Sequence, residues 1–363
     1  EDMLLKSIED YKKLSELNVC FLLTHVPNPR MNKRINVYKR NGHVSVICTR
    51  RKSQNIWEPQ IDGVDYNIFD VDLPSSAHII KRAIVSSGYQ TSALKKLNEI
   101  RPNVLYCGGL DSLIIAAKYM RKNINTKVIY EVADLRESYI AEPKNIIKRF
   151  LNNYIKVKEK KLFKNVELLV VTSPLFYDRY YCNLISRDRM VFIPNAPDKE
   201  IFANYKHKSK GRFTIGFIGG IRYLKQMKML VDVAGELECD VLFAGAGGTS
   251  SEYEEITAYC RGKEYVTFSG RYDYEKEIAR LSEKVDCVYA VYDADNPNVR
   301  IALPNKLYEA IVCELPIIVA KGTYLSELVE TWQVGLSVDH KDKQELMSAI
   351  SRLKMKSEFY YNL

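Results

Sequence analysis

Closely spaced cysteines are missing from this sequence, and their absence excludes two classes of site. The 363 residues include eight cysteines, and neighbouring cysteines are at least 21 residues apart. Without a Cys-x-x-Cys pair, neither a zinc site nor a thioredoxin-like redox motif is expected. Cys20, Cys48 and Cys287 instead lie within apolar runs, where a thiol acts as a small buried hydrophobe, as is usual in a reducing compartment.

Long apolar runs are also lacking. No stretch approaches the ~18–20 apolar residues that a membrane-spanning helix needs. Residues 1–17 have a helical pattern with four acidic side chains among the first ten, which argues against a signal peptide. The contents of 46% hydrophobic and 27% charged residues are typical of a globular enzyme and exclude a disordered chain, a collagen and a small disulfide scaffold. We therefore expect a cytoplasmic protein.

Basic residues outnumber acidic residues in the chain as a whole, and the excess lies in its N-terminal half. The formal net charge is +9, from 54 Lys and Arg against 45 Asp and Glu. Residues 1–200 have a net charge of +11, whereas residues 201–363 have a net charge of −2. This asymmetry indicates two modules with different partners, of which one is suited to an anionic surface or substrate.

The order of the predicted elements indicates an α/β fold with two Rossmann-like domains. Short β-branched runs alternate with longer helical patterns, which is typical of βαβ units and parallel sheets. The Lys-rich stretch 204–212 interrupts the alternation, which then restarts. We expect domains at residues 1–205 and 206–363, facing a central cleft. Ligands of such sheets bind outside the carboxyl ends of the strands.

A glycine pair follows the first predicted strand of the second domain. Gly219 and Gly220 end this strand, and Arg222 and Lys225 follow as a helix begins. Glycines allow close approach of a ligand, and a helix N-terminus with two cations attracts an anion such as a diphosphate. A tight turn with two solvated charges is an equally simple alternative.

A second glycine-rich turn, residues 245–248, follows the next strand. It includes Gly245 and Gly247 but lacks the full Gly-x-Gly-x-x-Gly pattern and the acidic residue of a dinucleotide site. A simple turn and a direct ligand contact are both compatible with this segment.

The most specific pattern lies in residues 303–319. Pro304 suits the first helical position, and Lys306 lies in the first turn, where the helix dipole disfavours a cation unless an anion is near. Glu309 follows one turn later and could accept the hydroxyls of a ribose. The alternative is an i,i+3 ion pair on a solvated face.

Together these segments resemble glycosyltransferase family four, the retaining GT-B enzymes, over about residues 19–353. In the C-terminal half the matching segments are, in family order, Ile215–Gly219 with Arg222 and Lys225, Phe243–Gly247, Val266–Gly270, Asp286 before a strand, and Pro304–Lys306 through Glu309 to Pro316. The looser N-terminal matches are Arg40–Val44, Val128–Leu135, Val171–Ser173 and Phe192–Asp198.

The resemblance implies a role for each matching residue. Arg222 and Lys225 would hold the donor diphosphate, and Glu309 would bind the ribose as the second Glu of the family's E-x7-E motif. The segment Leu303, Pro304, Asn305 and Lys306 would contact the phosphates or the donor sugar, beside the turn glycines Gly219, Gly220, Gly245 and Gly247.

The chain departs from the family pattern at several places. Ile301 stands where the first Glu of the motif would fall, and Thr24–Arg30 replaces a glycine pair after the first strand. Asp134 lies near the position of the catalytic-loop His, as in a subgroup with a V-x-D-L pattern. It would orient acceptor or sugar hydroxyls, and a structural capping carboxylate is the alternative.

A basic helix is predicted at residues 144–164. It has eight basic residues against Glu159, and its apolar residues occur near helical spacing. Basic surface gains affinity for anionic lipid, which would suit a lipid-linked acceptor. The alternative is a helix that packs its apolar face on the core and exposes its basic face. Nucleic acid is not expected as a partner, because no known binding motif is present.

The sequence thus predicts a retaining hexosyltransferase. It would use a nucleoside-diphosphate sugar, UDP-linked, to extend a glycan or lipid-linked acceptor of a bacterial surface polysaccharide such as a capsule. No carboxylate pair suits double displacement. The resemblance implies instead a front-face transfer in which the leaving phosphate helps to accept the proton. We expect no cofactor and no metal, and a peripheral position at the inner membrane face. The alternatives are a nucleotide-sugar 2-epimerase of the same fold and a non-catalytic GT-B partner subunit.

Overall fold

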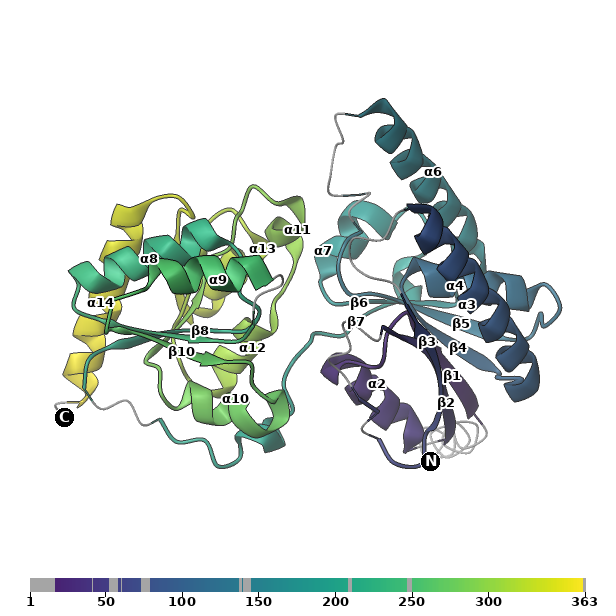
Figure 1. Ribbon diagram of the computed structural model, residues 1–363, viewed down its shortest axis with the longest axis horizontal. Coiled ribbons are helices and arrows are strands. Elements are labelled where there is room, and N and C mark those ends of the chain that lie inside the picture. The colour runs from purple at the N-terminus through teal and green to yellow at the C-terminus, as the bar shows by residue number, and fades with distance from the viewer. Residues whose placement is uncertain are drawn as a thin grey trace. The chain divides into compact units, whose positions relative to one another are not determined.

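The computed structural model describes residues 17–40, 42–51, 58–59, 61–72, 79–136, 139, 145–207, 211–246 and 250–361. The chain folds into two compact units, residues 1–193 and residues 194–363 (Figure 1). Each unit is a parallel β-sheet with helices on both faces, as the alternating pattern predicts.

The described part of the N-terminal unit has a seven-stranded sheet of order β3-β2-β1-β4-β5-β6-β7, in which neighbouring strands are parallel. Its strands are β1 (Leu17–Leu22), β2 (Gly42–Arg51), β3 (Asp65–Val71), β4 (Val104–Gly108), β5 (Lys127–Val132), β6 (Leu168–Val171) and β7 (Met190–Phe192). The order reverses between β1 and β4, which is the place where open α/β sheets bind ligands.

Helices cover both faces of this sheet. Helix α2 (Pro29–Lys39) packs Met31 and Ile35 on one face, against Val19, Phe21 and Val46. The other face is covered by α3 (Ile79–Ile100), α4 (Leu110–Met120) and α6 (Ile146–Leu162) (Figure 1). The short α7 (Pro174–Phe176) and a π-turn at Tyr177–Tyr181 follow β6.

The C-terminal unit repeats this plan with the order β10-β9-β8-β11-β12-β13 among its described residues. Its strands are β8 (Thr214–Ile218), β9 (Asp240–Ala244), β10 (Val266–Gly270), β11 (Cys287–Ala290), β12 (Ile317–Ala320) and β13 (Gly335–Val338). The reversal of order falls between β8 and β11. Residues after β8 and β11 therefore flank the expected ligand site of this unit.

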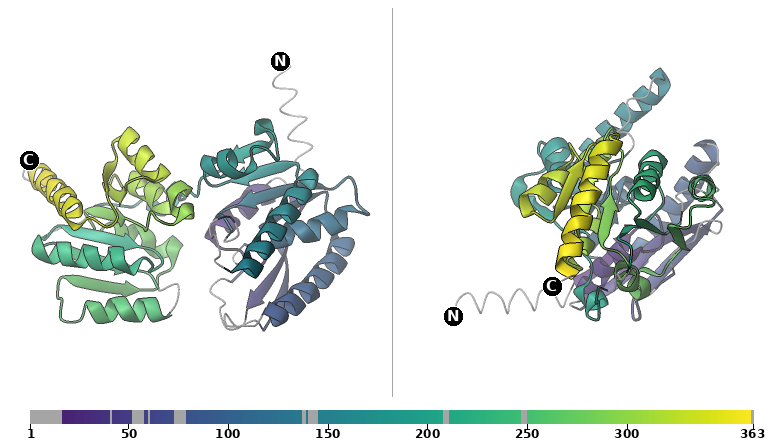
Figure 2. Two further views of the ribbon diagram at one scale, coloured as in Figure 1. Left: turned by 90° about the horizontal axis from the view of Figure 1, so that it is seen from above. Right: turned by 90° about the vertical axis from the view of Figure 1, so that its left-hand side faces the viewer.

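Two apolar layers hold the C-terminal sheet. One layer comes from α8 (Leu224–Glu236), α9 (Ser250–Tyr259) and α14 (Lys343–Tyr361), and α14 packs along α8 and β13 (Figure 2). The other layer comes from α10 (Tyr274–Ser282), α12 (Asn305–Val312) and α13 (Tyr324–Trp332). The short α11 (Pro297–Ile301) precedes α12.

The boundary between the units lies between Ile193 and Pro194. The sequence predicts it after residue 205, twelve residues later. The predicted linker begins at residue 204, but residues 199–205 already pack apolar side chains on the C-terminal unit. Phe202 is buried against that unit's core, and the backbone N–H of Lys206 donates to the Glu283 carboxylate. Burial of Phe202 outweighs the polar composition of this segment.

The expected burial of Cys20, Cys48 and Cys287 is confirmed; four of the other cysteines are also buried, and Cys182 is exposed. Burial raises the pKa of the Cys20 thiol to about 12. The described helices include none that is long and apolar enough to span a bilayer.

Candidate functional site

Two glycines meet at the carboxyl edge of the C-terminal sheet. Gly219 follows β8 with φ +142° and Gly245 follows β9 with φ +138°, conformations that favour glycine. The N–H of Gly219 donates to the Ala244 carbonyl at 2.7 Å. A Cβ added at Gly245 would lie 2.0 Å from the Gly219 carbonyl oxygen. The two turns are therefore packed backbone against backbone, and Gly245 has a structural reason to be glycine. Gly247 lies outside the described residues.

The ammonium group of Lys306 lies over this glycine edge. Its Nζ is 4.7 Å from the centre of the Phe217 ring and 5.7 Å from that of Tyr292. A Cβ added at Gly219 would lie 2.5 Å from the same Nζ, so the ammonium rests directly on the Gly219 backbone. These contacts place a cation over two aromatic faces at the reversal point between β8 and β11.

Burial and neighbouring charges set the ionisation of Lys306. Burial lowers its pKa to about 8, the charge of Glu309 raises it, and the charge of Arg222 lowers it further. The surroundings of Lys306 therefore stabilise its charged form less than water does. An anion bound beside it would stabilise the charged form.

Arg222 provides a second cation at the same edge. A Cβ at Gly220 would lie 3.5 Å from Arg222 Nε, so the guanidinium stem folds over the exposed Gly220. Arg222 itself is exposed, and its charge acts on both Lys306 and Tyr292. The cation pair that the structure assembles is thus Arg222 with Lys306.

Lys225, the second cation expected from the sequence, lies in the first turn of α8. Its side chain is exposed. Tyr223, the residue before this helix, is left-handed with φ 61° and provides no side-chain cap. The N-terminal turn of α8 therefore presents the Lys225 side chain toward solvent.

Glu309 is a buried carboxylate one turn after Lys306 on α12. It accepts a hydrogen bond from the Tyr274 hydroxyl at 2.9 Å. Burial raises the pKa of Tyr272, Tyr274 and Tyr292, and the charge of Glu309 raises each further. A carboxylate that accepts one hydrogen bond, from Tyr274, has acceptor capacity left for the two hydroxyls of a ligand.

The segment before Lys306 is partly structural. Leu303 is buried in the core with Leu307. Pro304 is the N-cap of α12 in extended conformation, so the helix begins at Asn305, one residue later than the sequence predicts. The Asn305 side-chain oxygen accepts a hydrogen bond from the Asn195 amide. Lys306 still falls in the first turn, as expected.

Ile301, at the position of the first Glu of the motif, ends α11 and is 1% exposed. This position therefore contributes a buried apolar side chain and no carboxylate. Asp134 belongs to the N-terminal unit, where it is exposed two residues after β5 ends. It therefore lies at the carboxyl edge of the first sheet.

A buried charge cluster in the N-terminal unit was not found from the sequence. Glu131 on β5 is 2% exposed and pairs with Arg30 at 3.1 Å and Arg34 at 3.6 Å. The Tyr106 hydroxyl donates to the same carboxylate. The available signal was an acidic residue within an otherwise apolar strand, together with arginines at the start of α2.

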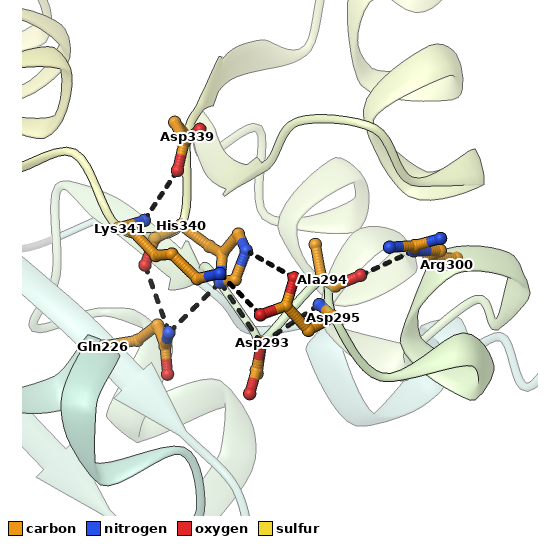
Figure 3. A network of polar contacts seen from close by, with 8 residues as sticks. All are labelled: Gln226, Asp293, Ala294, Asp295, Arg300, Asp339, His340 and Lys341. Atoms are coloured by element: carbon orange, nitrogen blue, oxygen red, sulfur yellow. Dashed lines mark hydrogen bonds and ion pairs between the residues drawn. The ribbon is translucent and has the colours of Figure 1, made fainter. Parts of the chain in front are cut away.

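A second polar network lies at the ends of β11 and β13 (Figure 3). His340 Nδ1 is 3.3 Å from Asp293 and also contacts the Gln226 amide, while its Nε2 is 3.7 Å from Asp295. Ligand atoms of Asp293, Asp295 and His340 lie within 4.8 Å of one another and could hold a metal ion. The Lys341 ammonium, 2.5 Å from Asp295, already pairs with this carboxylate, so contacts within the chain explain the network.

Comparison with known proteins finds a family model, a curated relative and solved structures that are similar to this chain. Residues 212–355 match the family model described as Glycosyl transferases group 1. The chain is 21% identical to the succinoglycan biosynthesis protein ExoL of Rhizobium meliloti (strain 1021), over 93% of this chain and 85% of the relative.

Solved structures with the same fold cover most of the chain. Sucrose-phosphate synthase from Thermosynechococcus elongatus superposes with a TM-score of 0.69 and 15% identity, covering 93% of this chain and 90% of that one. Alr3699/HepE of Anabaena, solved in complex with UDP, gives a TM-score of 0.66 at 15% identity, covering 94% and 91%. The chain has the GT-B fold that the sequence predicts, and the family match and the relatives support transferase activity.

Proposed function

We propose that this protein is a retaining glycosyltransferase that moves a sugar from a UDP-sugar to a glycan or lipid-linked acceptor during bacterial surface polysaccharide synthesis. The observation that carries the proposal is the group formed by Arg222, Lys306 and Glu309 at the carboxyl edge of the C-terminal sheet. The similarity of residues 212–355 to glycosyltransferases and the UDP complex of the HepE relative support a nucleotide-sugar donor.

The donor would lie with its diphosphate against Arg222 and Lys306, and Lys225 would face it from the first turn of α8. Departure of the nucleoside diphosphate leaves negative charge on a phosphate oxygen, and fixed cations lower the barrier by stabilising that charge. Glu309 would accept the hydroxyls of the ribose. These cations belong to the chain, so we propose that no metal or cofactor is needed to hold the diphosphate.

Retention of configuration needs the acceptor to approach on the side from which the phosphate leaves. The acceptor oxygen forms a bond to the anomeric carbon as the bond from that carbon to the phosphate oxygen breaks. The acceptor's proton passes to the departing phosphate. We assign the N-terminal unit to the acceptor and place Asp134 as a positioning carboxylate for acceptor or sugar hydroxyls.

The reaction is tested by incubating the protein with a labelled UDP-sugar and a bacterial membrane fraction that contains lipid-linked acceptors. Transfer of label to a larger or lipid-soluble product, with the anomeric configuration preserved by NMR, is the expected result. Activity unchanged by a chelator is expected as well. An inverted product would contradict the retaining assignment.

Two alternatives give different products. A 2-epimerase would convert the UDP-sugar to its epimer without any acceptor. A non-catalytic partner subunit, which the apolar Ile301 in place of a carboxylate would suit, would bind the donor without turnover. Chromatography of the nucleotide sugars after incubation with and without membranes separates all three.

A further inference from the structure

Helix α6 exposes apolar side chains where a helix of a soluble unit ordinarily buries them. Six large hydrophobic residues on it are more than one-third exposed: Ile146, Ile147, Phe150, Leu151, Tyr154 and Val157. Ile146 is 80% exposed and Phe150 is 76% exposed. All residues from Asn145 to Leu151 are exposed, so the first two turns of the helix project from the described body (Figure 1).

The six exposed hydrophobic residues share one face of the helix. At about 100° per residue, the six hydrophobic residues fall within an arc of about 140°. Ile155, Glu159 and Leu162 fall about 160–220° around the same helix and are buried or half-buried. The side of α6 that packs on the body is therefore different from its apolar side.

The residue that faces the body most closely is charged. Glu159 is 0% exposed and accepts hydrogen bonds from the hydroxyls of Tyr130, at 2.7 Å, and Tyr181, at 3.3 Å. A helix that packed its apolar stripe on the core would instead expose Glu159. The alternative of a core-facing apolar stripe, considered from the sequence, is thus wrong for this helix.

The remaining charge on the helix is positive. Between residues 145 and 165 the basic residues are Lys148, Arg149, Lys156, Lys158, Lys160, Lys161 and Lys164, whereas the acidic residue Glu159 is buried. Arg149, Lys156 and Lys160 lie along one edge of the apolar arc, and Lys158 and Lys161 lie within the arc in the last turns of the helix. Long basic side chains at this position can keep the charge at the level of lipid headgroups while the apolar face is inserted.

We infer that α6 is an interfacial helix that docks this protein on a membrane containing anionic lipid, with Ile146, Ile147 and Phe150 inserted among the acyl chains. The exposed apolar face selects a bilayer over a nucleic acid, which would bind the basic residues but not the hydrophobic ones. The basic flank with no exposed acidic residue selects an anionic surface. This docking does not depend on a transferase reaction.

The position of α6 in the fold determines which edge of the first sheet would approach the membrane. Helix α6 follows β5, so its projecting N-terminal turns start from the carboxyl edge of the first sheet, on the side where Asp134 lies. A docked α6 would bring that edge toward the headgroups. If the proposed function is correct, a lipid-linked acceptor would reach the N-terminal unit without leaving the membrane.

Vesicle flotation tests the inference with the full chain. We expect binding to vesicles of phosphatidylcholine with about one-third phosphatidylglycerol, and at least about tenfold weaker binding to phosphatidylcholine alone. Phe150→Asp should lower binding to the anionic vesicles about tenfold or more, because it places a carboxylate in the inserted face. Arg149→Gln, at an exposed position in the projecting turns, should lower it about fivefold.

Ile124→Asp is the matched control. Ile124 is 81% exposed in the same unit, in the turn between α4 and β5, and the substitution should leave vesicle binding unchanged. A circular dichroism spectrum and a thermal unfolding transition like those of the wild type would show that Phe150→Asp is folded. Equal binding of the wild type to both vesicles, or full binding by Phe150→Asp, would overturn the inference. So would a dimer in lipid-free solution that Phe150→Asp converts to a monomer, because a second copy would then cover the face.

Discussion

The ammonium of Lys306 lies 4.7 Å from the centre of the Phe217 ring, which joins the first turn of α12 to the end of β8. The contact holds a cation at the point where the strand order reverses, directly over Gly219. Burial there lowers the pKa of Lys306 to about 8, so its charge is sensitive to pH near neutrality and to any anion bound beside it.

The first prediction is that UDP binding weakens in alkaline solution. Lys306 is charged below pH 8 and becomes neutral as the pH rises through about 8. One pH unit above that pKa about a tenth of the side chains are charged, so the dissociation constant for UDP should rise by up to about tenfold. Lys306→Arg, which remains charged, should remove this pH dependence, as measured by titration calorimetry between pH 7 and pH 9.

The same lowered pKa predicts how stability depends on pH. In the unfolded chain the ordinary pKa of 10.5 applies, so between pH 8 and 10.5 the unfolded state binds more protons than the folded state. The contribution of Lys306 to the free energy of unfolding should therefore rise with pH through this window. Denaturant unfolding measures the free energy of unfolding of wild type minus that of Lys306→Met, and this difference should rise with pH through the window. A difference that stays constant would contradict the assignment of the titration to Lys306.

A second group of variants tests Glu309 as the ribose ligand. Glu309→Gln should weaken UDP binding by about 10–100-fold, because hydrogen bonds to a charged group are worth more than neutral ones. Tyr274→Phe, which removes the hydroxyl that donates to Glu309, should have a smaller effect. A UDP analogue without ribose hydroxyls should bind wild type and Glu309→Gln equally well. Unequal binding of that analogue would indicate that Glu309 contacts another part of the donor.

Gly245→Ala should unfold the edge of the C-terminal sheet. The new Cβ would lie 2.0 Å from the Gly219 carbonyl oxygen, and the φ of +138° is strained for alanine. We expect a loss of about 3 kcal/mol or more in the free energy of unfolding. Gly262→Ala is the control, since φ is +77° but open space surrounds the position, and it should cost only about 1 kcal/mol. Similar losses in both variants would mean that the turns at Gly219 and Gly245 can separate.

The buried charge cluster of the N-terminal unit gives a further stability prediction. Glu131→Gln removes the counter-charge of Arg30 and Arg34 and should lower the free energy of unfolding by about 3 kcal/mol. Asp70→Asn, which removes the partner of Arg50 at a more exposed site, should leave it almost unchanged. Chemical denaturation of the full chain measures both, and an unchanged Glu131→Gln protein would indicate that water already screens the arginines.

The sequence predicts the fold well because the apolar periodicities are local. Both parallel sheets follow from the alternation of elements. The short strand β13 and the helix α11 each have too few apolar positions to show a period in the sequence.

The site was only partly predictable. Arg222, Lys306 and Glu309 follow strand ends or begin a helix, and these positions mark them in the sequence. The contacts of Lys306 with Phe217 and Tyr292, and of Glu309 with Tyr274, join residues far apart along the chain, and local pattern does not encode them. For α6 the sequence could not decide which face meets the body, because the tyrosines that bind Glu159 come from β5 and the turn after β6.

The most direct test of the proposed donor site is calorimetric titration of UDP into wild type, Arg222→Ala and Arg261→Ala. Arg261 is also an exposed arginine of the C-terminal unit, but it follows α9 and precedes β10, at the amino edge of the sheet. We expect UDP to bind wild type and Arg261→Ala alike and to bind Arg222→Ala at least about tenfold more weakly, as for loss of a charge-assisted hydrogen bond. Equal affinity for all three proteins, or no binding to the wild type, would contradict a diphosphate site at the carboxyl edge of this sheet.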